Sequence, residues 1–155
     1  MELFRISTKE HSKQLSASGS PNRWNKKGEF VLYSSSSRSL STLELVVHRN
    51  AIKPTIPYKI MVISVADDDN LTHTIKTKDL PNKWNAMQAY AECQEIGSHW
   101  YQNKTSLILK IPSAIIQQEH NYIINTKHPE FEKQVQLIRT ENYFWDERLL
   151  PPISD

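Results

Sequence analysis

The chain is unusually poor in glycine. Only three glycines, Gly19, Gly28 and Gly97, occur among its 155 residues. Phosphate-binding loops of the Walker and Rossmann types need several closely spaced glycines, because the backbone must turn tightly and approach the phosphates. The three glycines stand too far apart to build either loop. If a nucleotide binds to this chain, side chains must therefore hold its phosphates.

Size and composition predict one globular domain that spans residues 1–155. A chain of this length buries roughly 68 to 70 per cent of its unfolded surface, which is enough for one core. Hydrophobic residues make up 38% of the chain and charged residues 23%, as in ordinary soluble proteins. The longest apolar runs, 60–63 and 107–109, fall far short of the roughly 20 residues that cross a bilayer. No membrane association is expected.

The N-terminal segment and the cysteine content predict a cytoplasmic protein. Residues 1–5 lack the basic region and long apolar stretch of a secretory signal. Cys93 is the single cysteine, so neither an internal disulfide nor a multi-cysteine zinc site can form. The formal net charge is only +2, from 19 basic and 17 acidic residues spread along the chain. This balance gives no support for direct binding of nucleic acid.

Hydrophobic patterning predicts a mixed α+β domain. Strands are expected at 3–6, 30–33, 58–65, 106–111, 123–124 and 136–140, with 144–145 as a possible continuation of the sheet. Helices are expected at 9–15, 38–48, 85–101 and 130–135, and the first clear loop at 16–28. Gly97 predicts a break in the helix expected at 85–101. Pro112 is expected to end the strand at 106–111. Because strands and helices alternate irregularly, a doubly wound sheet fits less well.

Two residues in and after the loop 16–28 could bind a dinucleotide. Arg23 lies within the loop, and a guanidinium can grip a pyrophosphate through paired hydrogen bonds. The alternative for Arg23 is an ordinary solvated arginine. Tyr33 ends the predicted strand 30–33, where its ring could stack on a flat cationic ring such as nicotinamide. The alternative for Tyr33 is packing in the core.

Glu44 lies in the apolar stretch 43–47, where a carboxylate seldom sits without a partner or a task. The segment 41–44 also matches the capping box, in which a glutamate at the third helical position bonds back to the cap. Leu40, however, belongs to the same apolar face, and the preceding serines could cap a helix that begins earlier. The sequence leaves both interpretations open, a structural cap or a functional carboxylate.

Ser113 follows the predicted strand 106–111 and Pro112. Its hydroxyl could point into a cleft at the sheet edge, or it could cap a turn over 114–118. No serine has the Gly-x-Ser-x-Gly surroundings of a serine hydrolase. The six histidines show no His-Glu-x-x-His spacing, and the acidic run 67–69 lacks the glycine and glutamate of a calcium loop. No metal site is expected.

Several short motifs, in their order and spacing from Phe4 to Leu149, together resemble the RES domain. They are Asn22-Arg23-Trp24-Asn25 with Gly28, Tyr33, Leu43-Glu44, Gly97-Ser98-His99-Trp100, Ile111-Pro112-Ser113-Ala114, Asn121-Tyr122-Ile123-Ile124-Asn125 and Phe144-Trp145-Asp146-Glu147-Arg148-Leu149. The family is named for an arginine, a glutamate and a serine. The resemblance maps these onto Arg23, Glu44 and Ser113, with Tyr33 as the associated aromatic residue. Lys26 departs from the family pattern, since relatives often carry proline there.

This resemblance implies a fold similar to the ADP-ribosyltransferases related to diphtheria toxin, a split β-sheet core with flanking helices and NAD in the cleft. It further implies a toxin of a type II toxin–antitoxin system that degrades NAD+ without a metal. The implied partners are an Xre-like helix-turn-helix antitoxin and a second copy of the chain in a homodimer.

The resemblance also assigns roles to the four site residues. Breaking the nicotinamide–ribose bond builds positive charge on the sugar, which a nearby carboxylate can stabilise. Glu44 would supply that carboxylate, and Arg23 would hold the pyrophosphate. Tyr33 would stack near the nicotinamide ring, and Ser113 would bond the nicotinamide amide or the ribose.

Three functions are left to distinguish. The leading hypothesis is an NAD+ glycohydrolase toxin. The same site could instead transfer ADP-ribose to a cellular protein, as a mono-ADP-ribosyltransferase. In a different class, the chain could be a non-catalytic module of a DNA-bound repressor complex, with Arg23, Tyr33, Glu44 and Ser113 purely structural. The weak net charge counts against direct DNA contact.

Overall fold

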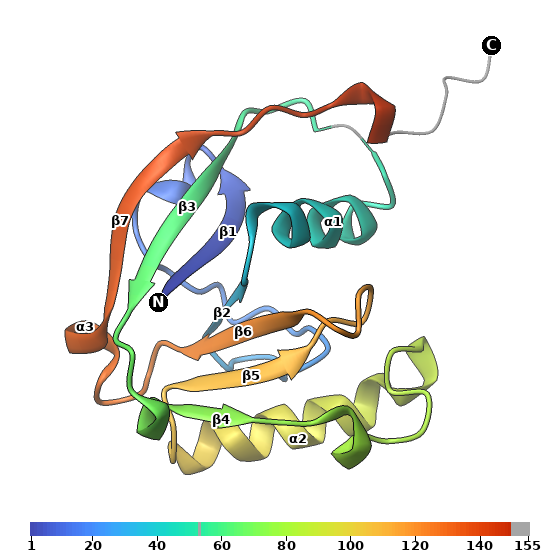
Figure 1. Ribbon diagram of the computed structural model, residues 1–155, viewed down its shortest axis with the longest axis vertical. Coiled ribbons are helices and arrows are strands. Elements are labelled where there is room, and N and C mark those ends of the chain that lie inside the picture. Colours follow the sequence, from blue (N-terminus) through green and yellow to red (C-terminus); the bar gives the residue numbers. More distant parts are fainter. Residues whose placement is uncertain (53, 150–155) are drawn as a thin grey trace.

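Strands dominate the computed structural model, which describes residues 1–52 and 54–149 (Figure 1). The strands are β1 (Glu2–Thr8), β2 (Val31–Ser35), β3 (Tyr58–Val65), β4 (Thr72–Thr74), β5 (Ile108–Pro112), β6 (His120–Asn125) and β7 (Val135–Asn142). The α-helices are α1 (Arg38–His48), α2 (Tyr90–Asn103) and α3 (Phe131–Gln134). Short 3-10 helices are η1 (His11–Lys13), η2 (Asp69–Leu71), η3 (Thr77–Asp79), η4 (Met87–Ala89) and η5 (Glu147–Leu149).

The sheet is split between β1 and β2. Its strand order is β4-β5-β6-β2-β1-β3-β7. β1 pairs with β3 along its whole length, from Glu2 to Thr8, whereas β1 and β2 pair only at Phe4 and Ser35. The strands β1, β3 and β7 therefore separate from β2, β6, β5 and β4, and α1 lies beside the opening (Figure 1). This confirms the predicted mixed α+β fold with a split sheet.

The half of the sheet formed by β2, β6, β5 and β4 has a separate apolar cluster on each of its two faces. In β6, Ile124 contributes to a cluster with Leu3 and Met61, while its neighbour Ile123 contributes to a cluster on the α2 side. This alternation follows from the two-residue period of a strand. Cys93 on α2 is fully buried in the second cluster, in agreement with a packing role. No helix in the described part of the chain is long and apolar enough to span a membrane.

The second long helix differs from its prediction in two ways. It begins at Tyr90 rather than at 85, because the residues before it form the 3-10 helix η4. It also continues without a break through Gly97. A Cβ at Gly97 would lie 1.9 Å from the carbonyl oxygen of Trp24. The glycine therefore allows α2 to approach the Trp24 backbone closely, and the predicted break was wrong.

Other differences arise where pairing between strands decides the structure. β4 is short and polar and was not predicted, since its parallel pairing with β5 comes from a distant segment. β5 includes Pro112, which pairs with His120 at the last position of the strand, where a missing N–H matters little. Only η1 forms within 9–15, and β7 ends at Asn142, so residues 144–145 do not continue the sheet. The bounds of α1 and β3 agree with the prediction.

Candidate functional site

A cavity of about 360 Å³ opens where the two halves of the sheet separate. Its walls come from β1, β2, α1, the loop segment 18–22 and, through Asn121, β6. Tyr33 and Glu44 line it, together with Arg5 and His48. A larger hollow of about 670 Å³ lies between β4 and α2, but none of the four predicted site residues lines it. The first cavity is therefore the candidate site.

Glu44 lies in the interior of α1 and is not part of a capping box. The helix is capped by Ser37, which has an extended backbone and accepts a hydrogen bond from the N–H of Leu40 through its side chain. Ser41 is already helical, and its hydroxyl donates to the backbone oxygen of Phe4 at 2.8 Å. The structural interpretation of Glu44 as a cap is thus ruled out.

The two carboxylate oxygens of Glu44 have different surroundings. Oε1 accepts a hydrogen bond from Ser113 Oγ at 2.8 Å and another from Asn121 Nδ2. Ser35 Oγ donates in turn to Asn121 Oδ1 at 2.7 Å. Oε2 accepts no hydrogen bond from any residue that the structure describes. A half-buried carboxylate thus lines the cavity with one oxygen held and the other available.

Ser113 touches Glu44 and also caps the following turn. It is fully buried, and its Oγ accepts hydrogen bonds from the N–H groups of Ile115 and Ile116 at 3.1 and 3.2 Å. Its one hydroxyl hydrogen goes to Glu44. The structure therefore brings Ser113 and Glu44 together, and Ser113 lies behind the carboxylate rather than on the cavity wall.

Tyr33 lines the cavity, but its hydroxyl is already engaged. The O–H donates to Asn25 Oδ1 at 2.7 Å and accepts from the N–H of Trp24 at 3.1 Å. Burial raises the pKa of Tyr33 well above its ordinary value, and only the Trp24 N–H and Arg23 oppose this rise. The phenol therefore stays protonated, and only its ring is free to meet a ligand.

The guanidinium of Arg23 donates to backbone carbonyls of the segment 84–86. Its Nη1 donates to the oxygens of Trp84 and Ala86 at 2.8 and 3.1 Å, and its Nη2 donates to Asn85 at 3.2 Å. The guanidinium carbon also lies 5.3 Å from the centre of the Tyr90 ring, at cation–π distance. Arg23 is not among the residues that line the cavity.

Arg5 is the arginine that lines the cavity, and it was not among the residues predicted from the sequence. Its Nη1 donates to the backbone oxygen of Tyr33 at 3.0 Å, and it forms no ion pair with any described residue. Burial lowers the pKa of Arg5, although an arginine in a protein keeps its proton. The available signal was a charged residue inside the apolar strand predicted at 3–6.

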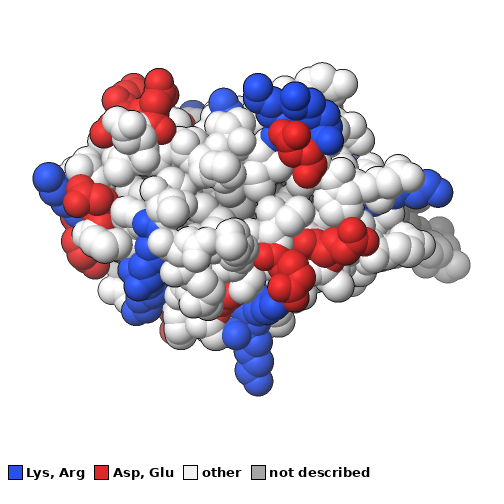
Figure 2. Space-filling model, turned by 90° about the horizontal axis from the view of Figure 1, so that it is seen from below, with Lys and Arg blue, Asp and Glu red and all other residues white. Residues whose placement is uncertain are grey.

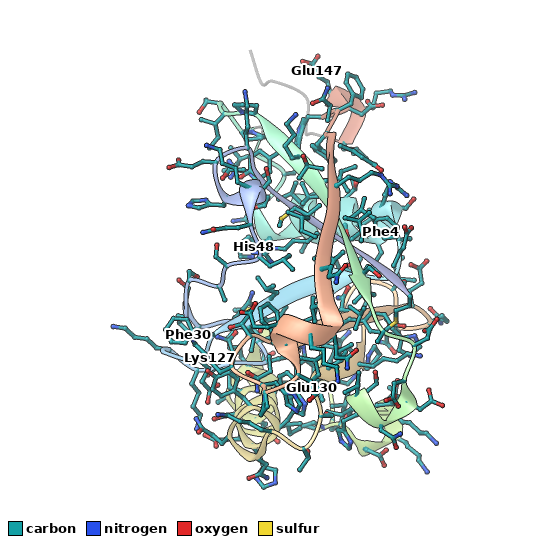
Figure 3. The ribbon with its side chains drawn as sticks, turned by 90° about the vertical axis from the view of Figure 1, so that its left-hand side faces the viewer. Phe4, Phe30, His48, Lys127, Glu130 and Glu147 are labelled. Carbon is teal, nitrogen blue, oxygen red and sulfur yellow. The ribbon has the colours of Figure 1, made fainter. Side chains whose placement is uncertain are left out.

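Side-chain amides and a buried carboxylate fix the loop 16–28 and connect it to α2. Asn25 donates to three backbone oxygens of the loop, and Gln94 of α2 donates to the backbone oxygens of Asn22 and Asn25. Glu29 is buried and accepts hydrogen bonds from Ser98 of α2 and from the N–H of Lys26. Below the loop, Lys127 lies beside Phe30 (Figure 3), with its Nζ 5.2 Å from the ring centre.

The chain is similar to several known proteins. "Toxin Res" of Yersinia enterocolitica is 29% identical over 127 residues, which cover 82% of each chain. "Prs ADP-ribosylating toxin" of a Sphingobium species is 32% identical over 129 residues, 83% of this chain and 80% of the relative. In the crystal structure of the M. tuberculosis MbcT–MbcA toxin–antitoxin complex, a matching chain has a TM-score of 0.71 at 18% identity, with 92% and 83% of the two chains covered. Since the RES domain family model matches residues 2–146, the chain belongs to the RES domain family.

Proposed function

We propose that this chain is the toxin of a toxin–antitoxin pair and that its cavity binds NAD+ and cleaves the nicotinamide–ribose bond. The relatives are named as toxins, one of them as ADP-ribosylating, and the matching solved chain comes from a toxin–antitoxin complex. The observation that carries the proposal is that Glu44 lines the cavity with an Oε2 that accepts no hydrogen bond from residues 1–52 and 54–149. The proposed chemistry uses no metal.

The reaction needs a negative charge beside the ribose. When the bond breaks, nicotinamide leaves with the bonding electron pair, and positive charge develops on the sugar. A carboxylate that is already oriented stabilises this charge without reorganising during the reaction. Glu44 has this arrangement, since its Oε1 is held and its Oε2 is without a hydrogen bond from the part of the chain that the structure describes.

The proposal divides the remaining residues between contact and support. The ring of Tyr33 would stack on nicotinamide, and Ser113 would hold Glu44 in place. Arg5 would supply the cationic group that faces the diphosphate, because its guanidinium lines the cavity without a counter-ion among the described residues. Arg23, with three carbonyls on its guanidinium, would hold the loop that forms the opposite wall.

The acceptor of ADP-ribose separates two versions of this function. Water as acceptor makes the chain an NAD+ glycohydrolase, which is the leading version. A protein as acceptor makes it a mono-ADP-ribosyltransferase, and the name of the Sphingobium relative favours keeping this second candidate. The proposed setting is the cytoplasm, with a homodimeric toxin and an Xre-like antitoxin as its partner.

The surface charges speak against the third candidate, a DNA-bound module. On the face shown in Figure 2, basic and acidic side chains lie interspersed, and the described residues form no broad basic patch there. DNA-binding proteins normally gather lysine and arginine on one face. This face therefore gives no support to a DNA-bound module, in line with the net charge of only +2.

Incubation of the purified chain with NAD+ tests the proposal. Free nicotinamide should appear with wild type, and Glu44→Gln purified in the same way controls for contaminating activity. NAD+ labelled in the adenylate part, added with cell extract, should leave the label in free ADP-ribose for hydrolysis and on protein for transfer. Absence of nicotinamide release by folded wild-type protein would overturn the proposal.

A further inference from the structure

The geometry points to Asn121 as a positioning residue that aims the Glu44 carboxylate, with Ser35 holding the Asn121 amide in place. This inference rests on the proposed function, because it assigns how the reactive carboxylate of that function is held. Neither residue figured in the roles that sequence analysis assigned.

Three adjacent strands bring these groups together. Ser35 on β2 and Asn121 on β6 are register partners, so the backbone ladder fixes their separation. Asn121 also pairs with Ile111 on β5, and Ser113 follows directly at the end of that strand. Glu44 approaches from α1 and meets Asn121 and Ser113 at the same oxygen. The carboxylate is thus held from two different strand ends.

The chemistry of the groups settles which way the Asn121 amide points. A carboxylate can only accept hydrogen bonds, so the amide atom that faces Glu44 must be the NH2 group. The amide oxygen then faces Ser35, whose hydroxyl can donate to it. The reversed amide would place an oxygen against the carboxylate and lose the bond to Glu44. The carboxylate therefore sets the orientation of the amide, and the Ser35 hydroxyl holds the amide in place by donating to its oxygen.

The consequence is an asymmetric carboxylate. Two donors on Oε1 oppose rotation of the Glu44 side chain, because turning it would break both hydrogen bonds. The second oxygen, which accepts no hydrogen bond from the described residues, is the one left for a ligand. A reacting sugar then meets a carboxylate whose orientation is set before binding, which is the condition for efficient charge stabilisation.

A double-mutant cycle tests the series of hydrogen bonds that runs from Ser35 through Asn121 to Glu44. Asn121→Ala should lower kcat for nicotinamide release by about 10- to 100-fold with a small change in KM, as expected for a group that acts in the transition state. Ser35→Ala should lower kcat by a few-fold. In the Asn121→Ala background, Ser35→Ala should have no further effect, because its only route to Glu44 is gone. If the double variant instead shows the product of the two single kcat losses, the inference is overturned.

Two further variants control for folding. Ser106→Ala removes a buried serine hydroxyl that bonds Trp100 and Ile108, away from Glu44, and should leave kcat unchanged. If Asn121→Ala does not fold, Asn121→Asp has nearly the same shape but places an acceptor against Glu44. It should lose activity at least as strongly. Asn121→Asp with wild-type kcat would also overturn the inference.

An NMR measurement separates failure of this inference from failure of the proposed function. The side-chain amide protons of Asn121 in the 15N-labelled chain should shift in both Ser35→Ala and Glu44→Gln, and stay unchanged in Ser106→Ala. This readout needs no turnover. If wild type releases no nicotinamide but these shifts occur, the proposed function fails and the hydrogen-bond chain stands. If the amide signals do not respond, the inference fails whatever the activity.

Discussion

The two sides of the cavity use their polar groups in different ways. On the α1 side, Glu44 keeps one oxygen without a hydrogen bond from the described residues, while Ser113 and Asn121 hold the other. On the opposite side, the polar groups of the loop form hydrogen bonds within the loop and to its neighbours. Arg23 donates to backbone carbonyls, and Asn25 donates to the backbone and accepts from the Tyr33 hydroxyl. The α1 side thus offers a carboxylate oxygen to a ligand, as the proposed reaction requires, whereas the hydrogen bonds of the loop hold its own shape.

This difference shows that residues of one family motif can have different structural positions and need not share a role. Arg23, Glu44 and Ser113 all belong to the RES pattern, yet only Glu44 lines the cavity. Free unpaired groups at a site cost stability and are kept where they are used, whereas satisfied groups stabilise the fold. Substitutions on the two sides should therefore have opposite signatures, loss of turnover on one and loss of stability on the other.

Glu44→Gln should produce the largest effect and mark the reactive side. The amide has nearly the same shape but no charge for the developing cation, so kcat should fall by about 10²- to 10³-fold, as on removal of other preorganised stabilising groups. The free energy of unfolding should change far less than the rate. Nicotinamide release and urea denaturation check the two parts. A large loss of stability with unchanged turnover would reverse the comparison.

Gly97→Ala should have the next largest effect and mark the supporting side. Alanine alone favours a helix by about 1 kcal/mol over glycine. Here, however, the new Cβ would meet the Trp24 carbonyl oxygen at 1.9 Å, so the backbone of α2 or of the loop must shift. We expect a net loss of about 2 to 3 kcal/mol in the free energy of unfolding, within the range for overpacking. Urea denaturation of the variant measures it, and a variant at least as stable as wild type would contradict the close approach.

Arg23→Ala tests whether this arginine supports the loop or binds the ligand. Loss of its bonds to the Trp84, Asn85 and Ala86 carbonyls should lower the free energy of unfolding by about 1 to 2 kcal/mol without NAD+ present. KM should rise only as far as the loop loosens. If stability stays at the wild-type value and KM alone rises strongly, Arg23 contacts the diphosphate and the division of roles with Arg5 is reversed.

The parts of the structure predicted from sequence are those that local pattern determines. α1 and β3 have the predicted bounds, since the three-to-four-residue spacing of Leu40, Leu43 and Val47 and the dense apolar run of β3 are local signals. Tyr33 and Glu44 were singled out from the sequence, and both line the cavity. The roles of Arg23 and Ser113 depend on which atoms surround them.

Features that depend on distant pairing stayed out of reach of the sequence. Ser35 and Asn121 are 86 residues apart and meet only because β2 pairs with β6. Arg5 reaches the cavity because β1 separates from β2 beyond a single paired position. Gly97 was assigned to a helix break because nothing in the sequence near it shows the Trp24 backbone. The positions of these residues are therefore determined by strand order and helix packing, which local sequence patterns do not reveal.

Glu141→Gln should have the smallest effect and serve as the baseline for the reactive side. Glu141 on β7 accepts two hydrogen bonds from Arg38, the first residue of α1, and these lower the pKa of its carboxyl from 4.5 to about 2. A lowered pKa in the folded state adds stability that is fully present above pH 4.5 and is lost as the pH falls through about 2. The variant should therefore melt slightly below wild type at neutral pH, with a difference in Tm that shrinks below pH 4.5.

The rate of nicotinamide release by Glu141→Gln should equal that of wild type, because Glu141 holds the start of α1 and lies outside the cavity. A drop in kcat comparable with that of Glu44→Gln would mean that the hold on α1, and not the carboxylate it carries, limits the reaction.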